Sequence, residues 1–365
     1  MRPEHIRRGR CVGVAATSHK AIHNLLGEIE EAAPWAAGDR EWPDYVRGTG
    51  RPPPESVDVG YPPHQRPGPV RELIASCGYG PQEPLVVAIN DRIHTQGCTR
   101  TGAPVTADTV TYLASLSKQF TAACVAILVA DGRLDVETPA AEFGPRLPTA
   151  IRVRHLLHHT AGLPDDVVVT GDRTSDGILA ALPTFDATPG IRYAYSNVGY
   201  VCLARIVETV CGAPIGDFAR TAVFDPLGMH DTRFWTGPQS WPADAAPLAQ
   251  AHPAPLSVGD GGAWGTAADL MRWGAGLDVD ALGISDLLQT PGWLDDGTAV
   301  DYAWGMGVRS VRGHVAYRHG GGWPGTRSML VRVPAEDLTI VVLALADDTE
   351  RRVALTDALL SLDDR

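Results

Sequence analysis

Residues Leu113–Phe120 read LASLSKQF and place Ser115 three positions before Lys118, at the start of a strongly helical segment. Side chains at positions i and i+3 of a helix project from one face, so these two can touch. A serine hydroxyl is a poor nucleophile until a neighbour takes its proton, and a desolvated lysine can accept that proton. The same spacing also occurs by chance on ordinary helix surfaces, so the rest of the chain must decide its meaning.

Two further stretches offer groups that would complete a site around Ser115. Tyr195 and Asn197 lie in the loop sequence YAYSN and bring a phenolic oxygen and an amide near one point. In residues 319–325, HGGGWPG, the successive glycines let another group approach the backbone closely, so that exposed N–H groups could stabilise an oxyanion. The alternative for the first stretch is an aromatic residue that only packs, beside an asparagine that forms a turn. The alternative for the glycines is a flexible β-turn.

A third stretch, LLHHTAGLP at residues 156–164, contains adjacent histidines. We expect His158 and His159 to bond backbone carbonyls and to shape the floor of a site. Adjacent histidines are not spaced for one helical face and have no acidic partner at a ligand-like offset, so we expect no metal. The chain contains no Gly-x-x-x-x-Gly-Lys-Ser/Thr loop, which argues against an ATPase, and we expect no cofactor.

The hydrophobic pattern predicts an α+β fold, with an antiparallel sheet built from both chain ends, flanking helices and a mostly helical inserted subdomain. The helix after Ser115 carries one apolar stripe, Phe120, Cys124, Ile127 and Leu128. The predicted strands are 85–89, 92–97, 304–311, 315–319, 328–333 and 338–345. The other predicted helices are 21–33, 70–76, 153–158, 200–210, 266–277 and 351–362.

Composition places limits on partners and location. The formal net charge of −12 argues against nucleic acid or an anionic membrane surface as the main partner. No apolar run approaches the ~18–20 residues that span a bilayer. The N-terminus lacks the apolar core of a secretory signal, and the 6 cysteines form no Cys-x-x-Cys pair. We therefore expect a cytoplasmic protein with reduced thiols.

Residues 1–68 differ in composition from the rest of the chain. The first twenty residues hold five basic residues and one acidic residue. Residues 34–69 are rich in Pro, Gly, Arg and Asp, which is typical of linkers or poorly ordered segments. We predict an N-terminal extension over residues 1–68 with no assigned function, a nucleic-acid tether being a weak alternative. A hydrolase domain over residues 69–365 would come after it, with a helical insert at about 120–300.

Six short motifs occur in a fixed order along the chain: Ser115-x-x-Lys118, LLHHTAGLP, Tyr195-x-Asn197, PLGM at 226–229, Gly261-Gly262-x-x-x-Thr266-Ala267-x-Asp269 and His319-x-Gly321. From about residue 70 to the end, this ordered set resembles the serine β-lactamase-related superfamily. The nearest branch contains class C β-lactamases, family VIII esterases and DD-peptidases. The resemblance implies a β-lactamase/DD-peptidase-like fold and a small-molecule acyl substrate, and it leaves the oligomeric state open.

The resemblance also implies a role for each motif residue. Ser115 would be the acylated nucleophile, Lys118 would accept or relay its proton, and Tyr195 would lie opposite as general base for acylation and deacylation. Which of Lys118 and Tyr195 holds the proton stays open, because coupled groups titrate as a set. Asn197 would bind the acyl chain and orient Lys118. The N–H groups of Ser115 and Gly322 would form the oxyanion hole.

His319, Gly320 and Gly321 would belong to the strand whose edge binds the substrate. β-Lactamases of this branch usually carry lysine at the position of His319, and a neutral histidine is a weaker anchor for a substrate carboxylate. We therefore expect an esterase that acts on small carboxylic esters or amides through an acyl-enzyme on Ser115, with little β-lactamase activity. The loops 165–190 and 237–260 are expected to shape its pocket.

Several alternatives use the same site. An alcohol or amine that intercepts the acyl-enzyme would make the protein an acyltransferase. Activity as a β-lactamase or as a D-aminopeptidase or carboxypeptidase also stays open. A penicillin-binding-type module that is acylated but does not turn over is the competing interpretation from a different functional class.

Overall fold

The computed structural model describes residues 69–171, 173–183, 188–237, 241–248 and 254–362. The extension predicted over residues 1–68 lies outside these described residues.

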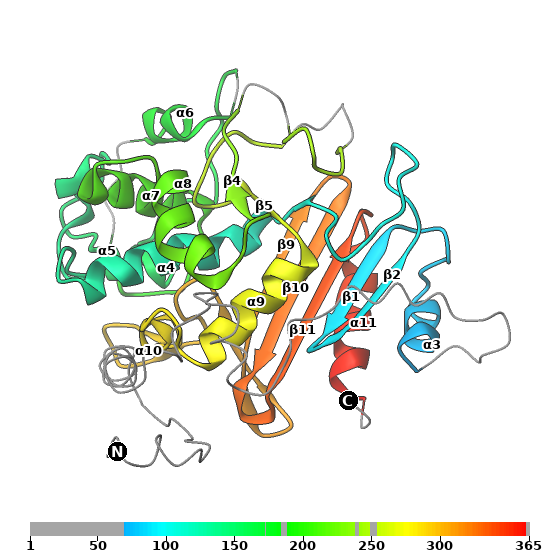
Figure 1. The fold of residues 1–365 in the computed structure, drawn as a ribbon. Helices are drawn as coiled ribbons and strands as arrows, with labels where there is room; N and C mark the ends of the chain where they lie inside the picture. The colour runs from blue at the N-terminus through cyan, green and yellow to red at the C-terminus, as the bar shows by residue number, and fades with distance from the viewer. Residues whose placement is uncertain (1–68, 172, 184–187, 238–240, 249–253, 363–365) are drawn as a thin grey trace, which may run out of the picture.

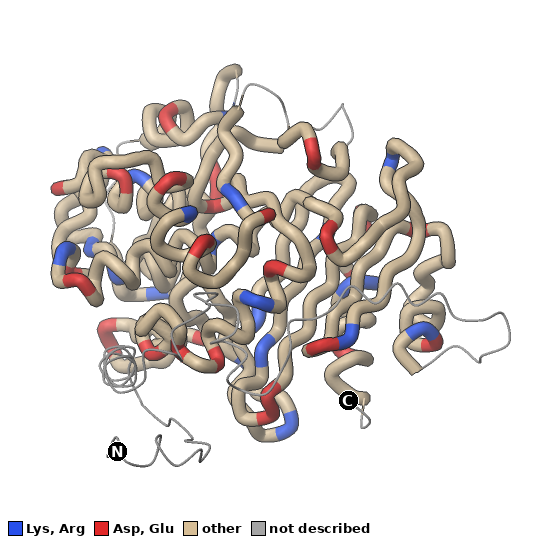
Figure 2. Tube along the Cα trace, viewed as in Figure 1, with Lys and Arg blue, Asp and Glu red and all other residues tan. Residues whose placement is uncertain are grey.

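As predicted, an antiparallel sheet joins the two ends of the described chain (Figure 1). Its six strands lie in the order β2-β1-β11-β10-β9-β8. The link between the ends is the pairing of β1 with β11, in which Leu85 faces Ala344. Neither of these central strands carries a charged residue, and both are completely buried (Figure 2). The strands are β1 Leu85–Ile89, β2 Arg92–Gln96, β8 Gly307–Val311, β9 His314–Trp323, β10 Thr326–Val333 and β11 Leu338–Ala344.

Alternate residues of the sheet enter two different cores. Leu85 and Val87 pack with Leu355 and Leu359 of α11 (Thr349–Leu360), and α3 (Pro69–Ser76) covers the same face. Val86 instead belongs to the larger cluster on the opposite face, where α9 (Ala267–Asp278) and the inserted helices lie (Figure 1). The period-2 alternation of side chains in a strand explains this division.

The insert between β2 and β8 is mostly helical, as predicted, and also contains two small sheets, β3-β5-β4 and β6-β7. Among the described residues no single helix is long and apolar enough to span a membrane, whereas the bent pair Asn197–Cys211 and Ile215–Leu227 meets the length and composition criteria. Besides α9, the predicted helices here are α4 Ser117–Ala130, α5 Val153–Leu157 and α7 Asn197–Cys211. The short helices α6 Ser175–Ala180, α8 Ile215–Ala219 and α10 Ser285–Leu288 were not predicted. The short strands are β3 Thr111–Tyr112, β4 Arg233–Phe234, β5 Ala263–Gly265, β6 Gly292–Trp293 and β7 Ala299–Val300.

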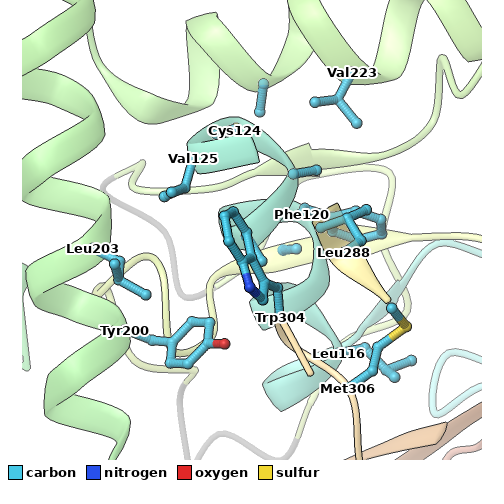
Figure 3. Close-up of a cluster of buried hydrophobic side chains, with 14 of the residues drawn as sticks. Leu116, Phe120, Cys124, Val125, Tyr200, Leu203, Val223, Leu288, Trp304 and Met306 are labelled. Carbon is cyan, nitrogen blue, oxygen red and sulfur yellow. The ribbon is translucent and has the colours of Figure 1, made fainter. Parts of the chain in front are cut away.

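Helix α4 is central, so the prediction of a single apolar stripe was wrong. It is buried on nearly every side, including the polar residues Lys118 and Gln119. Figure 3 shows Phe120 and Val125 enclosed by side chains from several other segments. A buried polar side chain requires a partner. Gln119 has one, because its Oε1 accepts a hydrogen bond from Trp273 Nε1 at 2.9 Å.

Two local predictions need correction. The strand predicted at 315–319 continues through the glycines to Trp323, so HGGGW is strand and not turn. The N-cap of α9 is confirmed, since Thr266 Oγ1 accepts from Asp269 N at 3.1 Å. The reciprocal half of a capping box is absent, because Asp269 Oδ2 accepts from Thr232 Oγ1 at 2.8 Å and from Asp231 N at 3.0 Å.

Gly305 allows its segment of the chain to pack directly against the backbone at the start of α4. Substitution of this glycine tests that close contact. Its φ is +79°, and an added Cβ would lie 2.7 Å from Lys118 O. Gly313 has a similar φ of +83° but meets nothing within 4 Å. We expect Gly313→Ala to cost about 1–2 kcal/mol through backbone strain alone. Gly305→Ala should cost a further ~1–3 kcal/mol from overpacking.

Chemical denaturation of both variants would measure these costs. Equal losses of unfolding free energy would contradict the close approach at Gly305.

Candidate active site

Ser115 lies in a 3₁₀ turn, Ala114–Leu116, directly before α4. Ala114 has a φ of +49°, which is uncommon for a residue with a Cβ and costs energy unless the surroundings hold it. Ser117 Oγ donates to Ala114 O at 2.6 Å, and Ser328 Oγ of β10 donates to Leu113 O at 2.8 Å. The turn that presents the serine is thus held from both sides.

Lys118 is completely buried, and its Nζ touches three oxygens. The distances are 3.1 Å to Ser115 Oγ, 2.8 Å to Asn197 Oδ1 and 2.7 Å to the backbone oxygen of Asp260. The two carbonyl oxygens can only accept, so each takes an Nζ proton. The third position of Nζ faces Ser115 Oγ at 3.1 Å, so a proton can pass between the serine and the amine while the amine keeps its other two bonds.

Asn197 is the first residue of α7, and the helix cap fixes its place. Ser196 is the N-cap, and its Oγ accepts from Gly199 N at 3.1 Å. The predicted contact between Asn197 and Lys118 is therefore present, with the amide oxygen turned to the amine. Sequence reasoning missed the Asp260 carbonyl, since a backbone acceptor leaves no residue-type signal; the neighbouring Gly261-Gly262 motif was the only indication.

Tyr195 lies beside Lys118 in an aromatic cluster. Its ring centroid is 5.0 Å from Lys118 Nζ, 4.3 Å from the ring of His159 and 6.2 Å from that of His319. The structure thus brings Tyr195 to the predicted site. Its hydroxyl makes no direct hydrogen bond with Ser115 within the described part of the chain, so the structure does not decide between Tyr195 and Lys118 as the acylation base.

The adjacent histidines, His158 and His159, have different hydrogen-bond partners. His158 lies against backbone carbonyls as predicted, with Nδ1 3.0 Å from Arg154 O and Nε2 3.3 Å from Thr290 O; burial lowers the pKa of His158, so the neutral ring has one N–H and donates it to one of the two. The prediction was wrong for His159, whose Nδ1 accepts from Ser196 N at 3.1 Å. Burial and nearby Lys118 lower the pKa of His159 well below its usual value. His159 is therefore a neutral ring packed against Tyr195.

The glycines of β9 permit two close contacts. A Cβ on Gly321 would overlap Leu113 O, and one on Gly320 would lie 2.6 Å from Arg352 Nη1. Gly322 has room, with its nearest contact at 3.6 Å. Strand β8 pairs with β9 only as far as Arg318, so beyond that point the β9 edge has no strand partner on that side among the described residues. Backbone N–H groups on this open edge can serve as oxyanion donors, as expected for Gly322.

A cavity of about 620 Å³ adjoins Tyr195 and His319. None of the described residues of loops 165–190 and 237–260 lines it, and the other residues of those loops lie outside the described part of the chain, so their predicted role in shaping the pocket stays a prediction. Sequence reasoning also missed most of its wall, because residues from separate segments meet only in the fold. The lining residues are Tyr193, Tyr195, Asp301, Tyr302, Gly307, Arg309, Arg318, His319 and Gly320.

His319 contributes no positive charge to this cavity. Burial, reinforced by the charge of Lys118, lowers the pKa of His319 to about 3. Its Nδ1 lies 2.7 Å from Gly320 O, and because a carbonyl only accepts, Nδ1 carries the proton. Nε2 is then a neutral acceptor. Two cations also line the cavity: Arg309, which lies 3.8 Å from Asp301 Oδ2, and Arg318, which lies 3.5 Å from Asp357 Oδ1.

The lowered pKa of His319 has a consequence for stability. The unfolded chain protonates this histidine as the pH falls through about 6.5, whereas the folded chain resists until about pH 3. Folding stability contributed by the neutral ring is thus fully present above pH 6.5 and is lost progressively below it. We expect His319→Asn to lose less unfolding free energy than the wild type between pH 7 and pH 4.5 in urea titrations.

The exposed His314→Asn variant serves as a control and should follow the wild type. An acid-induced loss that is identical in all three proteins would contradict a neutral buried His319.

Comparisons with known proteins agree with this geometry. A penicillin-binding protein from Bacillus halodurans has the same fold, with a TM-score of 0.67 and 24% identity, covering 80% of this chain and 98% of that one. Penicillin-binding protein 4* of Bacillus subtilis is 28% identical over 70% of this chain and 65% of its own length. A D-aminopeptidase of Gluconobacter oxydans is 25% identical over 66% of this chain and 50% of its own.

The chain thus spans about half to two thirds of the length of these curated relatives. The family model described as Beta-lactamase matches residues 85–363, which include every residue of the site described above. The chain belongs to the beta-lactamase family, the serine hydrolase family of the penicillin-binding proteins and D-aminopeptidases that it resembles.

Proposed function

We propose that the protein hydrolyses small carboxylic esters and amides through an acyl-enzyme on Ser115. The observation that carries this proposal is the buried amine of Lys118, which lies 3.1 Å from the serine oxygen and is held by two further acceptors. A buried amine in this position is an arrangement that activates a hydroxyl nucleophile.

The reaction has two stages. Ser115 Oγ attacks the substrate carbonyl and its proton passes to the Lys118–Tyr195 pair, while the carbonyl oxygen takes up negative charge beside the open edge of β9. The bond to the leaving group then breaks, and the leaving alcohol or amine receives that proton. Water attacks the acyl-enzyme in the second stage, with Tyr195 as the proposed base, and the acid departs as Ser115 regains its proton.

The neutral His319 supports a preference for substrates without a carboxylate at that point. Its Nδ1 proton is committed to Gly320 O, so it offers a substrate an acceptor and no cation. The aromatic residues Tyr193 and Tyr302 line the cavity together with the charged residues Asp301, Arg309 and Arg318, so the preference rests on the neutral ring of His319 and not on an apolar wall. We therefore rank ester and simple amide hydrolysis above β-lactam hydrolysis.

A second candidate is hydrolysis of D-amino-acid amides or N-terminal D-residues. It is supported by the D-aminopeptidase of Gluconobacter oxydans among the relatives. The Ser115 chemistry would be the same and only the acyl group would differ, so a substrate panel separates the two candidates.

The test combines labelling and turnover on the full chain. Intact-protein mass spectrometry should show one fluorophosphonate adduct on the wild type and none on Ser115→Ala. Ser117→Ala removes a neighbouring hydroxyl that is bonded to Ala114 O, and it should still be labelled, though more slowly. Turnover of p-nitrophenyl acetate should fall by about 10³-fold or more in Ser115→Ala, because the nucleophile is absent.

A panel of p-nitrophenyl esters, D- and L-alanine amides and nitrocefin then ranks the substrate classes. Labelling that persists in Ser115→Ala would overturn the assignment of the nucleophile. Nitrocefin turnover well above ester and amide turnover would overturn the substrate preference.

A further inference from the structure

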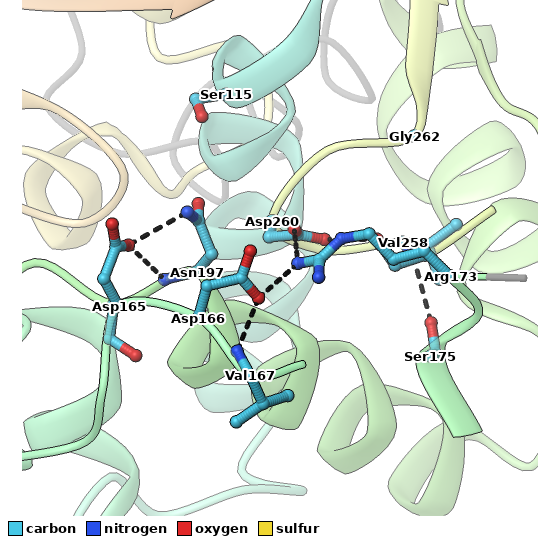
Figure 4. A network of polar contacts seen from close by, with 12 residues as sticks. Ser115, Asp165, Asp166, Val167, Arg173, Ser175, Asn197, Val258, Asp260 and Gly262 are labelled. Carbon is cyan, nitrogen blue, oxygen red and sulfur yellow. Dashed lines mark hydrogen bonds and ion pairs between the residues drawn. The ribbon is translucent and has the colours of Figure 1, made fainter. Parts of the chain in front are cut away.

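We propose that Asp165 and Asp166 are positioning residues that hold the two carbonyl acceptors of Lys118. Asp165 fixes the orientation of the Asn197 amide, and Asp166, acting through Arg173, fixes the segment that carries the Asp260 oxygen. Because both carboxylates serve Lys118, their role depends on the proposed function of Ser115. Figure 4 shows the two adjacent aspartates reaching to opposite sides of this network.

Asp165 decides which end of the Asn197 amide faces Lys118. The oxygen and nitrogen ends of an asparagine have nearly the same shape, so packing alone does not choose between them. Asp165 Oδ1 accepts from Asn197 Nδ2 at 2.9 Å, and this leaves Asn197 Oδ1 to accept from Lys118 Nζ at 2.8 Å. If the amide were flipped, its carbonyl oxygen would face the Asp165 carboxylate and its NH₂ group would face the Lys118 amine, and neither pair could form a hydrogen bond. The ionised carboxylate, which only accepts, therefore selects the productive orientation.

The backbone holds Asp165 in register with Asn197. Asn197 N donates to Asp165 O at 2.9 Å, and Ser196 Oγ donates to Pro164 O at 2.6 Å. The loop after the LLHHTAGLP motif is thus tied to the start of α7, where a negative charge is also favoured by the helix dipole. The carboxylate is exposed to solvent, so its contribution lies in this fixed geometry and not in a buried charge.

The second arm holds Asp260 by its side chain. Arg173 Nη2 lies 2.7 Å from Asp166 Oδ1 and 3.7 Å from Asp260 Oδ2. Asp260 Oδ1 accepts from Ser257 Oγ at 3.0 Å, and Leu256 N donates to Arg173 O at 2.9 Å. With its side chain held in this way, Asp260 turns its backbone oxygen to Lys118. Asp166 acts on Asp260 only through Arg173, so we expect the loss of Asp166 to slow acylation less than the loss of Asp165.

Neither aspartate lines the 620 Å³ cavity beside Tyr195. Their loss should therefore slow the acylation of Ser115 while leaving substrate affinity nearly unchanged. A misplaced catalytic group commonly costs one to two orders of magnitude in rate.

The experiment compares four variants of the full chain by the rate constant of fluorophosphonate labelling and by kcat and KM for p-nitrophenyl acetate. We expect Asp165→Ala to lower the labelling rate and kcat about tenfold or more, with KM changed less than about threefold. Asp165→Asn keeps an acceptor oxygen and should recover most of the rate, and Asp166→Asn should lose about two- to fivefold. Asp135→Ala is the matched control, since Asp135 is also an exposed loop carboxylate that accepts a backbone N–H, from Glu137 at 2.9 Å.

A double-mutant cycle separates positioning from general damage. In an Asn197→Ala background there is no amide to orient, so adding Asp165→Ala should change the labelling rate by less than about twofold. An Asp165→Ala rate equal to the wild type, or a loss of the same size in the Asn197→Ala background, would overturn the proposal.

A crystal structure of Asp165→Ala gives a readout that does not need activity. We expect the Asn197 amide to have turned and its oxygen to have left Lys118; an unmoved Asn197 would overturn the role of Asp165. If the wild type shows no labelling that depends on Ser115, the proposed function fails, and this structure still tests the positioning role separately.

Discussion

The buried amine of Lys118 is the interaction on which the rest of the site depends. An amine with no access to water needs oxygen partners, and three separate segments supply them: the turn before α4, the start of α7 and the loop before β5. Each segment in turn has its own anchor, such as the Ser196 cap of α7. The fold of the insert can be understood as the framework that brings these three segments to one nitrogen.

Strand β9 supplies the other half of the site, and it does so with its backbone. Gly320 and Gly321 lack side chains because Arg352 and the Leu113 carbonyl occupy the space where a Cβ would stand. The same strand places His319 in a buried position beside Lys118, where a second positive charge would be unfavourable and the ring is neutral. Close packing thus accounts for the glycines, and burial together with the nearby charge of Lys118 accounts for the neutral ring of His319.

Much of the fold could be predicted from the sequence, because its strands and helices have strong apolar patterns. A sheet built from both chain ends was predicted from their apolar runs, although not the pairing of β1 with β11, and Ser115, Lys118 and Asn197 meet as their motifs indicated. Contacts that depend on backbone atoms or tertiary approach were not predictable in this way. The Asp260 carbonyl, the cavity wall at Tyr302 and the role of His159 beside Tyr195 are examples, since each arises only when distant segments pack together.

The most direct measurement of acylation at Ser115 is a crystal structure of the fluorophosphonate adduct. We expect phosphorus bonded to Ser115 Oγ, with the phosphoryl oxygen about 3 Å from the backbone N–H groups of Ser115 and Gly322. Lys118 should remain bonded to Asn197 Oδ1 and to the Asp260 oxygen. An adduct on another residue, or a phosphoryl oxygen turned away from the open edge of β9, would contradict this mechanism.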